Sequence, residues 1–170
     1  MVNENPRSPS DIWFGIGLCY YRLGNLTKAK LSMDKTLELD PDNSMALVSM
    51  GIIEIASNIN DFEACEKAVQ YFEKSFQINP RNPLAIKYLA EHYFYQKKYD
   101  LCKELSKAGL LVLSSKKKPD RCELPSFRAE IDILKSYFFF LLGKVSHVSG
   151  NFDEAFQHYE ESLKHNSKNY

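Results

Sequence analysis

The sequence predicts an all-α fold, a right-handed α-solenoid built from four helical hairpins, or about eight helices. Two observations predict it. Residues 13–41 show the spacing of apolar and small residues that is typical of a helix–turn–helix unit of about 34 residues. A similar spacing returns three more times along the 170 residues. Because one such hairpin cannot bury its own apolar face, the hairpins are expected to stack on one another.

The first hairpin is predicted over residues 11–43, after an irregular lead over residues 1–10. Ser10 is the expected N-cap, because its hydroxyl can accept a hydrogen bond from a free N–H group of the first turn. The two helices are expected at about residues 11–23 and 26–39.

The spacing within this hairpin explains its helices and its turn. Residues three and four apart share one face of a helix. Gly24 suits the turn, because glycine tolerates the positive φ of a helix exit, and Pro41 cannot continue the second helix. Together with the two apolar stripes, these positions form the pattern of a tetratricopeptide repeat. The stripes are Trp13, Ile16, Gly17 and Tyr20, then Ala29, Met33 and Thr36.

The other three hairpins are predicted over residues 44–82, 83–114 and 126–167, so that residues 11–170 form a single solenoid domain. Two prolines and a run of lysines interrupt the pattern at residues 114–125, where an extended loop is expected. After this loop the first helix of the last hairpin is expected to be long, at about residues 126–149.

No catalytic residue, metal site or cofactor is expected. The four histidines lack the spacing of metal ligands. A thiol–imidazole pair of Cys122 and His147 is conceivable, but Cys122 falls in the predicted loop, where no helix N-terminus would activate its thiol. The four cysteines form no CxxC pair and are expected to be free thiols, mostly buried.

Charge and hydropathy exclude further classes of partner. The formal net charge is zero, which argues against direct nucleic-acid binding, because a nucleic-acid surface usually shows a basic excess. The longest apolar run, near residues 137–142, is too short to cross a bilayer, so no membrane contact is expected. No small-molecule ligand is expected either. Lys116, Lys117 and Lys118 fit a nuclear-localisation element or a phosphate contact, and a solvated loop also accounts for them.

The first helix of each hairpin should supply an inner, concave surface. The residues predicted there are mostly apolar or aromatic, and a large exposed apolar strip usually binds a partner. The alternative is that tight curvature buries this face within the array. The candidate partner-binding residues are Phe14, Leu18, Tyr21, Arg22, Met45, Val48, Ile52, Ile55, Lys87, Glu91, Phe94, Tyr95, Tyr137, Phe140 and Lys144.

One specific use of such a surface is disfavoured. Repeat proteins that bind the C-terminal carboxylate of chaperones need charge-assisted donors at set points of the inner face. Those points carry Phe14, Leu18 and Ser49 in the first two hairpins and Leu84 and Tyr88 in the third. A chaperone-docking role is therefore not expected.

Several stretches resemble one particular family. They are GIGLCYYRLGNLTKAK at residues 15–30, LELDPDN at 37–43, NPRSPSDI at 5–12, INPRNPLAIKYLAEHYFYQKKY at 78–99 and VSHVSGNFDEAFQHYEES at 145–162. In this order they closely resemble the Cln-three-requiring proteins, the tetratricopeptide-repeat subunits of the RNA polymerase II-associated factor (PAF) complex.

The resemblance implies a middle piece of a longer nuclear scaffold. It implies that the partners are the other PAF-complex subunits and, through them, RNA polymerase II. The implied role is in transcription elongation and the associated histone modification, without catalysis. Two alternatives stay open from the residues alone. One is a generic repeat adaptor, such as a co-chaperone or transport module, and the other is a regulatory domain of a larger enzyme.

Overall fold

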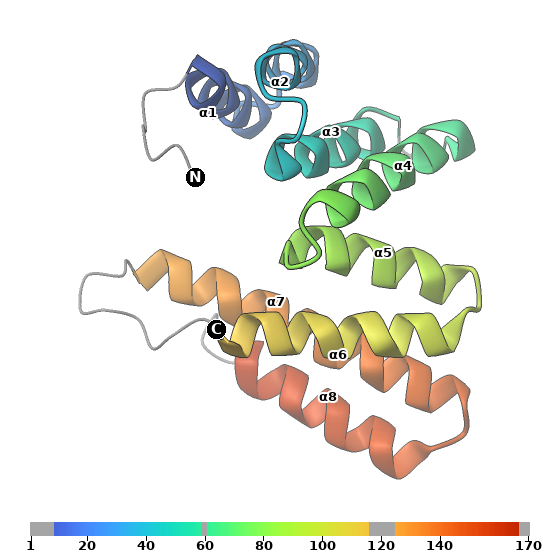
Figure 1. The fold of residues 1–170 in the computed structure, drawn as a ribbon. Helices are drawn as coiled ribbons and strands as arrows, with labels where there is room; N and C mark the ends of the chain where they lie inside the picture. Colours follow the sequence, from blue (N-terminus) through green and yellow to red (C-terminus); the bar gives the residue numbers. More distant parts are fainter. Residues whose placement is uncertain (1–8, 59–60, 116–124, 167–170) are drawn as a thin grey trace. The chain divides into compact units, whose positions relative to one another are not determined.

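Eight α-helices account for most of the described residues in a computed structural model of the chain (Figure 1). The structure describes residues 9–58, 61–115 and 125–166, and no strand occurs among them, which confirms the predicted all-α fold. No helix in these ranges is both long and apolar enough to span a membrane. The helices are α1 (Pro9–Arg22), α2 (Leu26–Leu39), α3 (Ser44–Ser57), α4 (Phe62–Ile78), α5 (Pro83–Tyr95), α6 (Tyr99–Ser115), α7 (Pro125–Val148) and α8 (Phe152–Asn166).

The chain divides into two compact units, Met1–Asn82 and Pro83–Tyr170. The first unit contains α1 to α4, in which α1 packs on α2, α2 on α3, and α3 on α4. The second contains α5 to α8, in which α5 packs on α6, α7 on α8, and α7 also contacts α5 and α6. Each unit therefore holds two helical hairpins. That all four hairpins form one domain stays a prediction.

The start of α1 differs from the prediction. The helix begins at Pro9, so Ser10 lies in its first turn and is not its N-cap. Proline suits a first turn, because its fixed φ matches the helix and a first-turn residue needs no N–H partner within the helix. In α2 the predicted bounds are confirmed, and the helix is capped by Asn25, whose side chain accepts a hydrogen bond from the Lys28 N–H at 3.1 Å.

Three hairpins turn through a residue with positive φ. The φ values are 75° at Gly24, 60° at Lys97 and 79° at Gly150. In each turn this residue donates its N–H to the carbonyl three residues earlier at 3.0 Å, so the three turns share one hydrogen-bond pattern. Lys97 is the residue in this set that carries a side chain.

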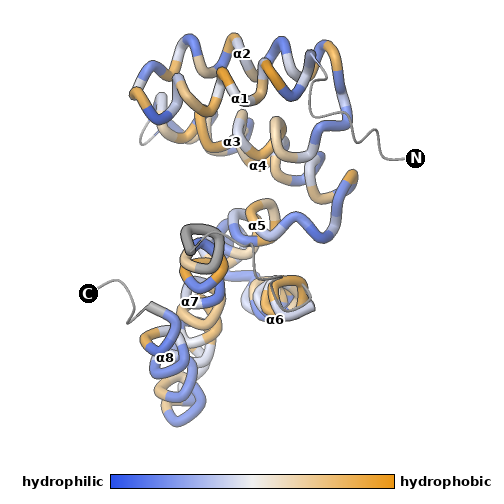
Figure 2. Tube along the Cα trace, turned by 90° about the vertical axis from the view of Figure 1, so that its left-hand side faces the viewer, coloured by the Kyte–Doolittle hydropathy of each residue, from blue (hydrophilic) through white to orange (hydrophobic). Residues whose placement is uncertain are grey.

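Close approach between helices depends on small residues. A Cβ added to Gly51 would lie 2.5 Å from the ring of Phe72, and one added to Gly109 would lie 2.3 Å from the ring of Phe138. Both rings are almost completely buried. A larger side chain at either glycine would therefore have to displace a core aromatic ring. Along α2 and α8, hydrophobic positions are interspersed among hydrophilic ones, as expected of helices that pack with one face (Figure 2).

Paired serines join the two helices of one hairpin in each unit. The Ser75 hydroxyl on α4 donates to the Ser44 carbonyl at the start of α3, at 2.9 Å. The Ser162 hydroxyl on α8 donates to the Ser136 carbonyl on α7, also at 2.9 Å. Serine at positions 75 and 162 is therefore explained by a hydrogen bond between the two helices of each hairpin.

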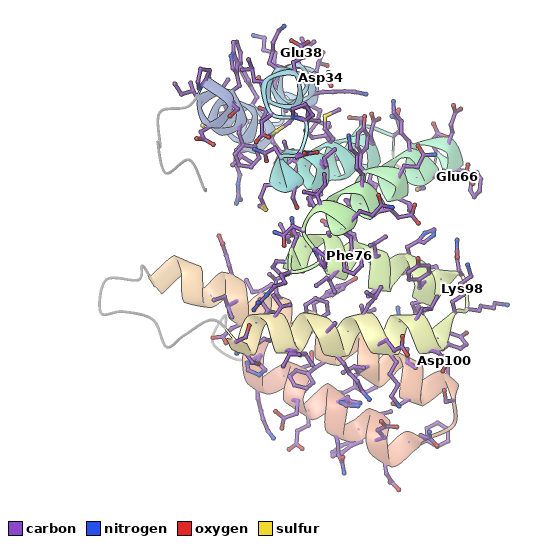
Figure 3. All side chains as sticks on the ribbon, viewed as in Figure 1. Asp34, Glu38, Glu66, Phe76, Lys98 and Asp100 are labelled. Carbon is purple, nitrogen blue, oxygen red and sulfur yellow. The ribbon has the colours of Figure 1, made fainter. Side chains whose placement is uncertain are left out.

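A buried carboxylate links three helices of the first unit. The Glu54 side chain on α3 is only 5% exposed, and its Oε1 lies 2.5 Å from the Lys30 Nζ on α2 and 3.3 Å from the Lys67 Nζ on α4. Other acidic residues of this unit, such as Asp34 and Glu38 on α2, are exposed at the surface (Figure 3). Glu54 therefore holds α2, α3 and α4 together through its charge.

Candidate functional site

In the first unit, the predicted surface residues divide into exposed and packed groups. Leu18 on α1 is 41% exposed, and Met45 and Ile55 on α3 are 44% and 36% exposed. Arg22 is also exposed, and Ile52 is half-buried. These side chains leave apolar surface on both helices.

Other residues predicted for this surface face the interior. Phe14 and Tyr21 on α1 pack against the core cluster that contains Met33 and Met50. Val48 on α3 is 1% exposed. Spacing along one helix locates a face but does not say how deeply the next helix covers it, so spacing alone does not separate these three residues from exposed ones.

In the second unit, the predicted residues lie together on α5 and α7. Lys87, Glu91, Phe94 and Tyr95 follow one another at helical spacing on α5, and Tyr137, Phe140 and Lys144 do so on α7. The two helices contact each other, and lysine–aromatic contacts connect them. We call these seven residues, with Tyr88, the lysine–aromatic cluster.

Lys87 lies between two tyrosine rings of this cluster. Its Nζ is 4.1 Å from the centroid of Tyr88 and 4.5 Å from the centroid of Tyr137, so the side chain bridges α5 and α7. Burial lowers the pKa of Lys87, and the nearby charge of Glu91 opposes this shift. Burial, together with a hydrogen bond to Glu91, raises the pKa of the Tyr137 hydroxyl well above its usual value. Glu91 therefore acts on both Lys87 and Tyr137.

Lys144 lies among three other rings. Its Nζ is 4.0 Å from the centroid of Phe94, 5.1 Å from that of Tyr95 and 5.5 Å from that of Phe140. A cation within about 6 Å of a ring centroid is attracted by the electrons of the ring face. Within the described ranges, no carboxylate lies within ion-pairing distance of Lys144.

The rings around Lys144 reach the surface. Tyr95 is 70% exposed and Phe140 is 41% exposed. Phe140 also contacts Tyr137 and Tyr159, with centroids 6.4 and 6.0 Å apart. The face thus combines exposed aromatic area with lysine charge, whereas the sequence predicts a mostly apolar or aromatic surface.

The candidate partner-binding residues omit three aromatic members of this region, Tyr88, Tyr99 and Tyr159. The sequence places Tyr88 on the inner face, but only as a point that lacks the donor of a carboxylate clamp, and its contact with Lys87 joins adjacent helix residues, which do not normally face each other. Tyr99 contacts Phe94 with centroids 5.7 Å apart. Tyr99 and Tyr159 come from α6 and α8, the second helices of their hairpins, whereas the inner face is predicted from the first helices.

The residues considered for chemistry do not converge on a reactive site. Among the described residues, no group of three or more His, Cys, Asp or Glu side chains could hold a metal ion. His158 lies 3.6 Å from Glu154, and His165 lies 3.4 Å from Asp132 and stacks on Phe139. Cys122 and the lysine run at 116–118 lie outside the described residues.

The three described cysteines are free thiols, as predicted, but they are not mostly buried. Cys102 is buried in the core of the second unit, but Cys19 and Cys65 are exposed free thiols.

Comparisons with known proteins identify the repeat. Residues 10–43 match the family model of the tetratricopeptide repeat. A protein described as CTR9 homolog from Arabidopsis thaliana is 32% identical over 96% of this chain. The RNA polymerase-associated proteins CTR9 of Caenorhabditis elegans and Saccharomyces cerevisiae are 28% and 27% identical over 93% and 97% of it. The chain is a tetratricopeptide-repeat segment similar to part of CTR9.

The chain spans only a small part of these relatives, namely 13%, 12% and 15% of their respective lengths. Solved structures support the fold. Pseudomonas aeruginosa pilF has a TM-score of 0.67 and 22% identity, with 93% of this chain and 61% of that chain covered. A thermophilic TPR protein of Thermus thermophilus has a TM-score of 0.62 and 16% identity, with 98% and 78% covered. These likenesses place the chain in the helical-repeat solenoid class.

Proposed function

We propose that the chain is a non-enzymatic scaffold segment that holds partner subunits of the PAF complex on RNA polymerase II in the nucleus. The observation that carries this proposal is the similarity, over more than nine-tenths of the chain, to proteins named RNA polymerase-associated protein CTR9. Through this assembly the segment would act in transcription elongation and the histone modification that accompanies it. Its contacts would be with proteins rather than with nucleic acid.

The geometry supports binding rather than catalysis. The lysine–aromatic cluster offers aromatic area and positive charge, and its eight residues include no paired nucleophile and base. Exposed aromatic side chains carry much of the binding energy in protein interfaces. The second unit therefore supplies a surface of the kind that a scaffold needs.

A co-purification experiment tests this function. The protein that contains this segment is tagged in its own cells, in full length and with residues 9–166 deleted, and recovered from nuclear extract. We expect the full-length protein to be nuclear and to recover RNA polymerase II and the other PAF-complex subunits, and we expect the deletion to lose at least one of these subunits. Equal recovery by both forms, or a full-length protein that recovers no polymerase, would contradict the proposal. Recovery of a chaperone in place of polymerase would favour a generic adaptor.

A further inference from the structure

The positive charge in the lysine–aromatic cluster is only partly balanced. Glu91 acts on Lys87 and on the Tyr137 hydroxyl. Lys144 has three aromatic rings around its ammonium group and no carboxylate partner among the described residues. The cluster therefore carries one more lysine than acidic side chains.

Aromatic rings attract this ammonium group but do not exhaust its capacity to bind. A lysine ammonium has three N–H donors. Rings at 4.0 to 5.5 Å attract the charge but accept none of these donors as a carboxylate would. Lys144 is half-buried, so an anion that reaches its ammonium group would meet the charge in a surrounding of lower polarity than water, where an ion pair is stronger.

The exposed rings indicate what should flank that anion. Tyr95 is 70% exposed and Phe140 is 41% exposed, and both contact Lys144. An inorganic anion would leave these two rings uncovered. A peptide segment with an acidic side chain between apolar residues would do both: the acid would neutralise Lys144, and the apolar residues would cover the rings.

We propose that the α5–α7 face binds a partner segment in which a glutamate or aspartate pairs with Lys144 and flanking apolar residues pack on Tyr95 and Phe140. This inference rests on the proposed scaffold function and names the chemistry of the partner segment at one surface. Lys144 acts as the specificity residue, because its charge makes an acidic segment bind more tightly than a neutral one of the same shape.

The test uses the full 170-residue chain and two helical peptides of about 15 residues. Both peptides have leucine at the same positions. The remaining positions are all glutamate in the first peptide and all glutamine in the second. Binding is measured by fluorescence anisotropy at low and high salt. We expect the glutamate peptide to bind about tenfold more tightly at low salt, and this preference to shrink as salt screens the ion pair.

Three single substitutions test whether the preference for the glutamate peptide depends on Lys144. Lys144→Met keeps an apolar stem and should abolish the preference, whereas Lys144→Arg should retain it. Lys107→Met, which removes an exposed lysine from α6, is the matched control and should bind as the unaltered chain does. Circular dichroism of each variant checks that its helices are retained.

Three outcomes would overturn the inference. The first is equal binding of the two peptides, and the second is a preference for the glutamate peptide that survives in Lys144→Met. The third is concentration-dependent dimers of the chain that Lys144→Met abolishes, because such dimers would show that a second copy of the chain occupies this face. The co-purification experiment tests the scaffold function independently of these peptides. If the full-length protein recovers no polymerase, the scaffold function is contradicted whatever the peptides show.

Discussion

At the scale of single residues, Glu54 shows how one side chain can fix three helices. Its carboxylate is 5% exposed, whereas the side chains of its partners Lys30 and Lys67 are 38% and 51% exposed. Burial opposes ionisation of Glu54, but hydrogen bonds and charge from the two lysines outweigh it and lower the pKa of the carboxyl group. Removing one member of such a pair leaves charge without compensation in a partly buried place.

Glu54→Gln should therefore lower the free energy of unfolding, by about 1 kcal/mol once solvent screening at the two lysines is allowed for. Urea unfolding followed by circular dichroism measures this. Because the folded pKa lies below the reference value of 4.5, the stabilisation is present above about pH 4.5 and is lost as pH falls through the folded pKa. The difference between the two proteins should accordingly vanish in acid.

Glu38→Gln serves as the control for that experiment. Glu38 pairs with Lys35 at 2.5 Å, but both side chains are more than half exposed. We expect a loss below about 0.5 kcal/mol. Equal losses for the two substitutions would show that burial of Glu54 contributes nothing.

At the scale of elements, the turns between paired helices show what the sequence could and could not reveal. Gly24 was identified as a turn residue because glycine adopts positive φ readily. Lys97 adopts the same conformation, with φ of 60°, and nothing in its residue type signals this. Its neighbours impose the conformation through the hydrogen bonds that close the turn, from the Lys97 N–H to Phe94 and from the Lys98 N–H to Tyr93.

Lys97→Gly should stabilise the second unit by about 0.5–1 kcal/mol, because it relieves a left-handed conformation that L-residues adopt at a cost. Lys97 is exposed, so the substitution removes little packing. Gly150→Ala, in the equivalent turn before α8, is the reverse control and should destabilise by a similar amount. If Lys97→Gly lowered the midpoint of urea unfolding, strain at this turn would not explain the result.

Helix bounds and the stripe of α2 were more accessible to sequence reasoning than the binding surface was, whereas Trp13 and Ile16 of the predicted α1 stripe are 39% and 36% exposed. The bounds of α2 follow from Asn25 and the 3.6-residue period, and the structure agrees with them. The burial of Val48 and the packing of Phe14 depend on contacts with other helices, which one-dimensional spacing does not contain. The cation–aromatic character of the α5–α7 face has the same origin, since Lys144 meets Phe94 and Tyr95 only after two hairpins have packed.

At the scale of the whole molecule, the repeated hairpins form two units that can be described separately. Each unit has its own core, with Met33 and Met50 in the first and Cys102 and Leu141 in the second. In our proposal the first helices of these hairpins present side chains to partners, and the second helices pack behind them. A scaffold segment of this kind can carry different chemistry on each unit, as Leu18 and Met45 on one and the lysine–aromatic cluster on the other illustrate.

The central claim is that the first-helix face of the second unit binds a partner of the polymerase-associated complex. It is tested most directly by quantitative co-purification of RNA polymerase II with the full-length protein carrying Tyr95→Glu and Phe140→Glu together. The control is Leu111→Glu, which changes an apolar residue on α6 that is 71% exposed. We predict at least a tenfold loss of polymerase with the paired substitutions, intact helicity in both variants, and full recovery with the control. Unchanged recovery with the paired substitutions would contradict the account.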